Sequence, residues 1–264
     1  MKKLTKILSA VLALAIMVTF AGCGSKGNDT SSKDDGKLKT AKPGKLVMAT
    51  NAYFQPYEFY DGDKIVGIDV EIAEAIAKNL GLELVVEDMA FDSIITSVAE
   101  GSADFGLAGM TITDERLKSV DFSISYAKGV QSIVVKEGSP IKTVDDLLAE
   151  GATYKSGTQL GTTGYIYAKD DMGEKRVTPY TSGNEAINAL IGGDIDCVII
   201  DNAPAKAFVE NNKDLKILDT AYADEDYAAC VAKGNNQLLE AIDGAISELT
   251  ADGTIQKIVD KYIK

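Results

Sequence analysis

The chain has 264 residues, 45% of them hydrophobic and 25% charged, which is enough for one large core or two modest ones and argues against disorder. With 40 acidic and 27 basic residues its net charge is −13, which excludes nucleic acid as a partner and disfavours anionic membrane surfaces. The chain has no histidine and only three cysteines, without short spacing, so it lacks the usual ligands of a zinc site. We therefore predict neither a metal nor a cofactor.

Residues 1–22 have the pattern of a secretory signal, with two early lysines ahead of an apolar run that is too short to span a membrane. The run Phe20-Ala21-Gly22-Cys23 resembles a bacterial lipobox, which implies lipidation of Cys23. The alternative is ordinary signal cleavage beside a chance cysteine. Residues 23–44 are small, polar and without periodicity, as in a flexible tether. We expect an exported protein, lipid-anchored at the outer face of the cell membrane.

The folded part begins with alternating strands and helices. In chain order the pattern predicts a strand at 45–50, an aromatic-rich loop at 51–59, a helix beginning at Asp69, a strand at 82–86, a helix at 91–100 and a strand at 104–108. Asp69 is the predicted N-cap of the first helix, and Gly81 ends it. Strands that alternate with helices favour a mostly parallel sheet covered on both faces.

The pattern restarts after an extended segment at 129–135. It predicts helices at 144–150, 184–191 and 203–211, strands at 153–159, 176–180, 195–200 and 227–232, and a helix opened by Gly161-Thr162-Thr163-Gly164. Two helices close the chain, one with apolar residues from Leu238 to Leu249. Cys197 and Cys230 lie in apolar runs, where we prefer buried free thiols to a disulfide. The chain therefore has two α/β units.

The stretch from Leu107 to Arg116 is typical of a ligand-binding edge. An apolar strand end turns at Gly109 and is predicted to enter a helix near Thr113. Open α/β sheets bind ligands at such junctions, because free backbone N–H groups and the helix dipole favour an anion. Arg116 adds a planar set of donors that matches a carboxylate, unless it forms a surface ion pair with a neighbour such as Asp114.

Two further strand-to-helix junctions carry polar groups. Thr162 and Thr163 stand at a helix start, where they are plain caps or donors to an anion. Asp201 ends the apolar run 197–200 and begins a helix. It is an N-cap, an acceptor for an ammonium group, or both, because a carboxylate has two oxygens and several acceptor sites.

Four runs of the sequence, within residues 45–263, together resemble one known family. They are Gly67-Ile68-Asp69-Val70-Glu71-Ile72, the stretch from Gly109 to Arg116, Gln159-Leu160-Gly161-Thr162-Thr163, and Asp201-Asn202-Ala203-Pro204. The chain is similar in these runs to the type-3 (polar amino acid) extracellular solute-binding proteins of ABC importers.

The resemblance implies an α/β, two-lobed periplasmic-binding-protein-like fold of type II, in which two β-sheet lobes with flanking helices are joined by two crossover hinge segments. The crossovers would lie near 126–129 and 223–227. Lobe 1 would comprise residues 45–126 and 228–264, and lobe 2 residues 127–227. The ligand would sit between the lobes and stabilise their closure.

The resemblance also implies roles for single residues. The ligand carboxylate would be bound by Arg116 and by the N–H groups of Thr111, Thr162 and Thr163, and the ligand ammonium by Asp201 and the carbonyl of Gly109. Phe54 and Phe91 would sandwich the ligand, and Gln159 would reach the cleft.

Asn51 occupies a position at which family members for basic amino acids often have an acid. A neutral side chain there favours an uncharged polar ligand such as glutamine or cystine, although Glu58, Asp92 or Glu225 near the site would change this preference.

We therefore expect a lipoprotein, a monomer and no enzyme, that captures a free amino acid and delivers it to an ABC permease in the membrane. Three alternatives stay open. The first is a dehydratase-like enzyme of the same fold, the second a binder of arginine or lysine, and the third a ligand-sensing partner of a receptor.

Overall fold

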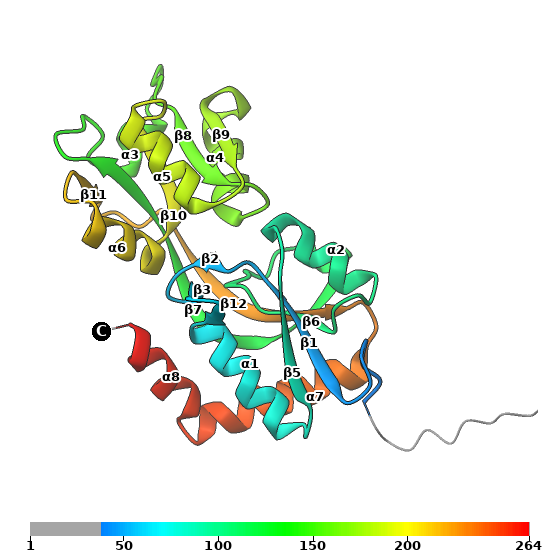
Figure 1. The fold of residues 1–264 in the computed structure, drawn as a ribbon. Coiled ribbons are helices and arrows are strands. Elements are labelled where there is room, and N and C mark those ends of the chain that lie inside the picture. Colours follow the sequence, from blue (N-terminus) through cyan, green and yellow to red (C-terminus); the bar gives the residue numbers. More distant parts are fainter. Residues whose placement is uncertain (1–37, 264) are drawn as a thin grey trace, which may run out of the picture. The chain divides into compact units, whose positions relative to one another are not determined.

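The structure, a computed structural model, describes residues 38–263 (Figure 1). The predicted leader, the lipidation at Cys23 and the tether as far as residue 37 lie outside the described residues. Residues from 38 onward form one compact unit. Between residues 38 and 263, no helix combines the length and the hydropathy that a membrane span requires.

A nine-stranded sheet runs through the described residues in the order β5-β1-β6-β12-β7-β10-β8-β9, with β11 paired to β7. Its strands are β1 (Lys45–Thr50), β5 (Glu83–Asp88), β6 (Phe105–Gly106), β7 (Val120–Lys136), β8 (Ser156–Gln159), β9 (Val177–Tyr180), β10 (Cys197–Asp201), β11 (Leu215–Ile217) and β12 (Ala223–Ala232). A small separate sheet occupies the segment expected to be a loop. It consists of β2 (Tyr53–Phe54), β3 (Glu58–Asp61) and β4 (Lys64–Val66).

The large sheet is mixed, which corrects the prediction of a mostly parallel one. The groups β5-β1-β6 and β10-β8-β9 are parallel. Between them, β7 and β12 are antiparallel to each other, β7 is antiparallel to β10, and β12 is antiparallel to β6. The reason is the chain path: β7 carries the chain from the first group to the second and β12 carries it back alongside (Figure 1). The expected crossovers lie inside these strands, where Tyr227 pairs with Ala127. The exact lobe boundaries stay a prediction.

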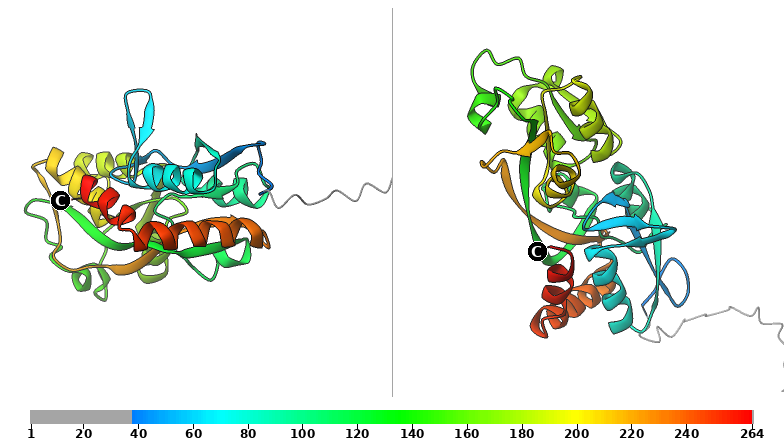
Figure 2. Two further views of the ribbon diagram at one scale, coloured as in Figure 1. Left: turned by 90° about the horizontal axis from the view of Figure 1, so that it is seen from below. Right: turned by 60° about the vertical axis from the view of Figure 1, so that its left-hand side comes forward.

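Both faces of the sheet are covered, as predicted. Successive residues of each strand point to opposite faces, so one strand contributes side chains to the buried clusters on both faces. In β1, Leu46 and Met48 belong to one buried cluster, whereas Val47 and Ala49 belong to another. In β10, the alternation places Cys197 and Val198 in two different clusters. Each parallel group forms a lobe with its own helices (Figure 2). Buried side-chain clusters lie on either side of each lobe's strands.

The helices divide between the lobes according to chain order. The first lobe has α1 (Ile68–Asn79), α2 (Ile94–Ala99), α7 (Asn236–Ala251) and α8 (Thr254–Tyr262). The second lobe has α3 (Val144–Leu148), α4 (Thr163–Met172), α5 (Gly183–Gly192) and α6 (Asn202–Asn211). Three short 3-10 turns complete the described helices, at Phe91–Ser93, Arg116–Lys118 and Glu174–Arg176. The first lobe therefore contains both ends of the described chain.

The stretch after Gly109 does not form the predicted helix. Thr111 makes an isolated bridge to Tyr227, and the N–H of Ile112 donates to the carbonyl of Asp226. Only a 3-10 turn at Arg116–Lys118 fits before β7 begins. Pairing with β12 thus overrides the local helix signal, because β12 satisfies backbone groups that a helix would otherwise use.

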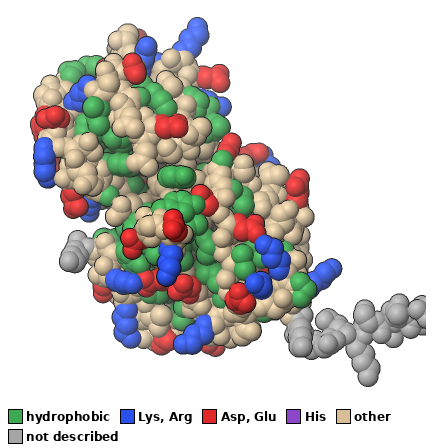
Figure 3. All heavy atoms as spheres, viewed as in Figure 1, with side chains coloured by type: hydrophobic (Ala, Val, Ile, Leu, Met, Phe, Trp, Pro, Cys, Tyr) green, Lys and Arg blue, Asp and Glu red, His purple; other side chains and the backbone are tan. Residues whose placement is uncertain are grey.

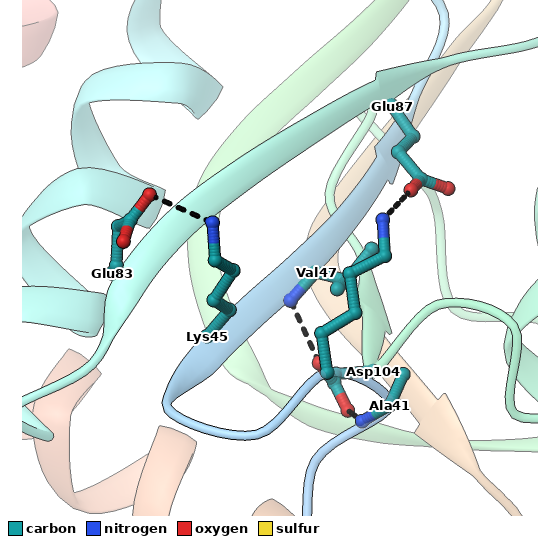
Figure 4. A network of polar contacts seen from close by, with 7 residues as sticks. Ala41, Lys45, Val47, Glu83, Glu87 and Asp104 are labelled. Carbon is teal, nitrogen blue, oxygen red and sulfur yellow. Dashed lines mark hydrogen bonds and ion pairs between the residues drawn. The ribbon is translucent and has the colours of Figure 1, made fainter.

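The start of the described chain is tied to the first lobe by a buried carboxylate (Figure 4). Asp104 accepts hydrogen bonds of 2.7 Å from the N–H groups of Val47 and Ala41. An exposed pair, Lys45 and Glu83, joins β1 to β5 at 3.1 Å but contributes little, because solvent screens it. The buried Asp104 therefore does more than the visible salt bridges to anchor the chain at β1.

Charged side chains are interspersed on the face shown in Figure 3, where no single basic patch covers either lobe. Cys197 and Cys230 are both buried free thiols, as predicted. Burial raises the pKa of each thiol to about 12, so both stay protonated and unreactive at neutral pH.

Candidate functional site

One cavity collects every residue that the sequence nominated for binding. These residues are Asn51, Phe54, Phe91, Gly109, Thr111, Arg116, Gln159, Thr162, Thr163 and Asp201. The cavity lies at the carboxyl ends of four strands, β1 and β6 of the first lobe and β8 and β10 of the second. Open α/β sheets bind ligands at such edges. Which of these residues touch a ligand stays a prediction.

Arg116 supplies the positive charge of the cavity. Its side chain is buried, and its Nη1 and Nη2 donate to the carbonyls of Thr111, at 2.6 Å, and Gly161, at 3.0 Å. The guanidinium lies over the Phe91 ring, 5.5 Å from its centroid. These bonds use two of five donors, so three remain for a ligand. None of the ion pairs within residues 38–263 involves Arg116, so the surface-pair interpretation is wrong.

Burial lowers the pKa of Arg116, and the nearby carboxylate of Glu225 opposes that shift. Glu225 is itself buried and accepts a hydrogen bond of 2.9 Å from Gln131 Nε2. A buried guanidinium stays charged in either case, because its ordinary pKa is far above neutral. Arg116 therefore presents a desolvated cation whose attraction for an anion is stronger than it would be at the surface.

Asp201 supplies the negative charge of the cavity. Its Oδ2 accepts from the Tyr227 hydroxyl at 2.6 Å and from the N–H of Val130 at 3.1 Å. Its Oδ1 accepts from the N–H of Ala203 at 2.9 Å, which confirms the N-cap of α6. Burial raises the pKa of Asp201, and these three hydrogen bonds oppose the rise. A carboxylate has about four acceptor sites, so Asp201 can cap the helix and still accept from a ligand.

Direct contacts join the two sides of the cavity. Gln159 Nε2, from the second lobe, donates to Asn51 Oδ1 of the first at 2.9 Å, and Arg116 reaches across to Gly161. Gly161 packs so closely on Asp92 that a Cβ at its position would lie 2.9 Å from the Asp92 Cβ. The lobes are therefore in a closed arrangement, and closure assembles the cavity from both.

Asn51 and Gln159 form one wall of the cavity. Asn51 Nδ2 donates to the carbonyl of Met89 at 2.8 Å, and Gln159 Nε2 also donates to the carbonyl of Thr181 at 3.2 Å. Both side chains are buried. Because each amide already has partners, this wall is neutral and held in place.

The acids that would have changed the charge of the cavity do not line it. Glu58 is buried beside Asp69, Asp92 is exposed, and Glu225 is bonded to Gln131. Among the described residues, Arg116 and Asp201 are the only charged side chains in the lining. The cavity therefore offers one cation, one anion and otherwise neutral groups.

The aromatic side chain of Phe54 packs closely against Gly109. Phe54 stacks on Tyr57 with centroids 5.6 Å apart, whereas Tyr53 is half exposed and does not line the cavity. Gly109 has a φ of 52°, and a Cβ there would lie 2.8 Å from the Phe54 ring. Only glycine fits this close approach without strain.

The helix start at α4 places backbone donors at the cavity. Thr162 is the N-cap, and its hydroxyl accepts from the N–H of Tyr165 at 3.3 Å. Thr163 is buried in the first turn. The cap interpretation is thus confirmed for Thr162, and the free N–H groups of the turn still favour an anion.

Five further lining residues were not nominated from the sequence. They are Ala108, Gln131, Ile199, Ile200 and Tyr227. Tyr227 lies far along the chain from Asp201 and reaches it only through the pairing of β7 with β12. Its neighbours in the sequence, acids before it and alanines after it, do not indicate Asp201 as its partner, so only strand pairing could have found it.

Comparisons with known proteins agree with this geometry. Residues 46–264 match the family described as bacterial extracellular solute-binding proteins, family 3. The chain is 34% identical to the arginine-binding extracellular protein ArtP of Bacillus subtilis, covering 96% of both chains, and 32% identical to the L-cystine-binding protein TcyJ of Escherichia coli, covering 97% of this chain and 94% of that one. An ancestral arginine-binding protein, solved with glutamine and with arginine, is 40% identical; both structures cover 84% of this chain and 99% of their own, with TM-scores of 0.78 and 0.77.

Proposed function

Because the chain belongs to family 3 of the bacterial extracellular solute-binding proteins, which bind solutes and are not enzymes, we propose that it captures a free α-amino acid for an ABC importer. The two lobes then correspond to the type II periplasmic-binding-protein fold of its structural relatives. The amino acid occupies the cavity between them, and binding favours the closed arrangement because the ligand contacts both lobes at once.

The observation that carries the proposal is the pair of opposite charges in an otherwise neutral cavity. Arg116 and Asp201 are both buried, and they are the only charged lining residues among those described. An amino acid has one carboxylate and one ammonium, so it neutralises both desolvated charges at once. Arg116 binds the carboxylate with its remaining donors, and Asp201 binds the ammonium.

Backbone groups complete both contacts in this proposal. The N–H groups of Thr111 and of the α4 start at Thr162 and Thr163 bind the same carboxylate, because a helix N-terminus favours an anion. The carbonyl of Gly109 accepts from the ammonium together with Asp201. Support for these roles comes from the lining position of each residue.

The ligand side chain is proposed to be polar and uncharged, such as that of glutamine or cystine. It extends between Phe54 and Phe91 towards the neutral wall of Asn51 and Gln159. A guanidinium in this place would be buried without a carboxylate partner, which is costly.

Arginine is the second candidate, because ArtP of Bacillus subtilis is named for it and the ancestral relative was solved with it. That ancestral protein was also solved with glutamine, so a relative of this fold accepts both ligands. We favour the neutral ligand because the lining has no acid besides Asp201.

Delivery in this proposal follows the lobed architecture. The protein is held at the outer face of the membrane by a lipid on Cys23, acts as a monomer, and presents its closed form to the permease. The hinge is formed by β7 and β12, with the boundary near 126 and 227 in the predicted crossovers.

A thermal-shift screen of the natural amino acids, cystine and ornithine tests the function. A ligand that binds only the folded state raises the melting temperature according to its affinity and free concentration. We expect glutamine or cystine to give the largest rise. A largest rise with arginine or lysine would contradict the neutral ligand, and no rise with any amino acid would contradict the function itself.

A further inference from the structure

Two carboxyl side chains, Glu58 and Asp69, lie fully buried behind the cavity. Glu58 is in β3 and Asp69 in the first turn of α1, and both have an exposure of 0%. The two carboxyl groups lie close enough for each to shift the pKa of the other. None of the ion pairs within residues 38–263 involves either of them. Neither acid lines the amino-acid site described above.

Asp69 is not the N-cap that the sequence predicted. Gly67 is the N-cap of α1 and has no side-chain cap, whereas Asp69 lies inside the first turn. Its Oδ2 accepts hydrogen bonds from the N–H of Gly109 at 2.7 Å and from the hydroxyl of Tyr126 at 2.8 Å. Asp69 therefore ties α1 to a residue that lines the cavity and to a residue of the crossover strand β7.

Counting donors shows that the pair needs a proton. With both carboxyls ionised, Asp69 Oδ1 and both oxygens of Glu58 would have no donor among the residues that the structure describes. Buried polar atoms without partners are rare, and two buried like charges are costly. A single proton on Glu58 makes this side chain a donor to Asp69 Oδ1 and removes one of the two charges.

The surroundings decide which acid holds the proton. Burial, then the charge and hydrogen bond of Asp69, and the charge of Asp88 raise the pKa of Glu58 well above its usual 4.5. Burial also raises the pKa of Asp69, to about 6, but the donors on Gly109, Tyr126 and Glu58 hold it down. Asp69 also lies in the first turn of α1, where the helix dipole favours a negative charge.

Besides Asp88, whose charge acts on Glu58, two phenols face the pair. Tyr57 and Tyr126 both have their pKa raised, first by burial and then by the nearby carboxylates, so neither gives up a proton at neutral pH. Glu58 is thus the group in this cluster that binds the additional proton.

We propose that Glu58 and Asp69 share one proton carried by Glu58, and that this pair holds Gly109 in the conformation in which it faces the ligand. The first part concerns the pair alone, and the second part rests on the proposed function. Gly109 has a φ of 52°, and its N–H is fixed by Asp69. Glu58 acts on the cavity only through Asp69, so both are positioning residues.

The pair has a predictable effect on stability against pH. The folded-state pKa of Glu58 is above its unfolded value, so its contribution to stability is fully present below that unfolded value and is lost as pH rises through the folded pKa. The window begins at the usual 4.5 and extends upward. Glu58→Gln supplies a permanent donor to Asp69 and removes this slope, because an amide does not titrate.

Three measurements on the purified chain test the proposal, with Glu240→Gln on the exposed face of α7 as a matched control. Infrared spectroscopy at neutral pH should show a protonated carboxylic acid that disappears in Glu58→Gln and persists in Glu240→Gln. The melting temperature of the parent and of Glu240→Gln should fall from acid to alkaline pH relative to Glu58→Gln. Absence of the acid band, or an unchanged slope in Glu58→Gln, would overturn the shared proton.

The positioning part is tested with L-glutamine in calorimetry. Glu58→Gln should bind as the parent does, whereas Asp69→Ala should bind about tenfold more weakly or worse, because the N–H of Gly109 then loses its acceptor. Equal losses in folded Glu58→Gln and Asp69→Ala would overturn the positioning role. If the parent binds no amino acid, the proposed function and the positioning role fail together, while the acid band still decides the shared proton.

Discussion

Gln159 Nε2 donates a hydrogen bond of 2.9 Å to Asn51 Oδ1, and this contact joins the two lobes at the wall of the cavity. The bond exists only in the closed arrangement, because its partners come from β8 and from the loop after β1. The same contact therefore closes the cavity and makes its wall neutral. In the proposed function, this contact would link lobe closure to the choice of ligand.

The first prediction concerns ligand charge. Asn51→Asp should shift the ratio of affinities from glutamine towards arginine by about tenfold or more, because a buried guanidinium then gains a carboxylate partner. Competition calorimetry with the two amino acids measures the ratio. Asn236→Asp, which adds the same charge at the exposed start of α7, serves as the control and should leave the ratio unchanged. An unchanged ratio in Asn51→Asp would remove this wall from the specificity site.

The second prediction concerns Arg116. Arg116→Ala should weaken amino-acid binding by ~3 kcal/mol, on the order of a hundredfold in Kd, because the ligand carboxylate loses its counter-charge in a buried site. Arg116→Lys keeps the charge but not the planar fork, and should recover only part of the affinity. Calorimetry measures both, and circular dichroism checks the fold. Near-native affinity in Arg116→Ala would show that the carboxylate binds elsewhere.

The third prediction concerns Asp201. Asp201→Asn keeps the cap acceptor for Ala203 but removes the negative charge and sets an NH2 group against the N–H of Val130, so binding of an α-amino acid should fall by about 2 kcal/mol or more. Tyr227→Phe, which removes one donor to Asp201 and no charge, should cost only about 1 kcal/mol. Titration calorimetry on both variants gives the comparison. A larger loss in Tyr227→Phe than in Asp201→Asn would contradict the ammonium contact.

The fourth prediction separates backbone strain from a steric clash. Gly109→Ala introduces a Cβ at 2.8 Å from Phe54 and at a φ of 52°, so both stability and binding should fall. Gly81→Ala has a φ of 68° with open space around it, and should lower stability by about 1 kcal/mol while binding stays intact. Denaturant unfolding and calorimetry distinguish the two effects. Equal binding by both variants would mean that the contact of Gly109 with Phe54 has no role in the site.

Much of the local structure was predictable from the sequence because its signals are local. Continuous apolar runs placed β1 and β10, helical spacing placed α1 and α7, and the glycine and threonine run placed the start of α4. The nominated binding residues were also found together, since most follow strand ends or begin helices. A strand end at the carboxyl edge of a sheet is visible in a single sequence.

The direction of strand pairing was not predictable in the same way. β7 and β12 belong to distant parts of the chain, and only their pairing makes the sheet mixed and replaces the expected helix after Thr113 with a short turn. Hydrophobic periodicity describes one segment at a time, whereas pairing depends on which segments meet.

The amino-acid sequence by itself determined which chemical groups line the cavity: a guanidinium at Arg116, a carboxylate at Asp201 and a neutral amide at Asn51. The tertiary structure decided what each can do, because burial and hydrogen-bond partners set the electrostatics. It buried Asp69 against Gly109 rather than at a helix cap, and placed Glu58 beside it. The type of each residue fixes its functional group, but its desolvation and its hydrogen-bond partners exist only once distant segments pack together.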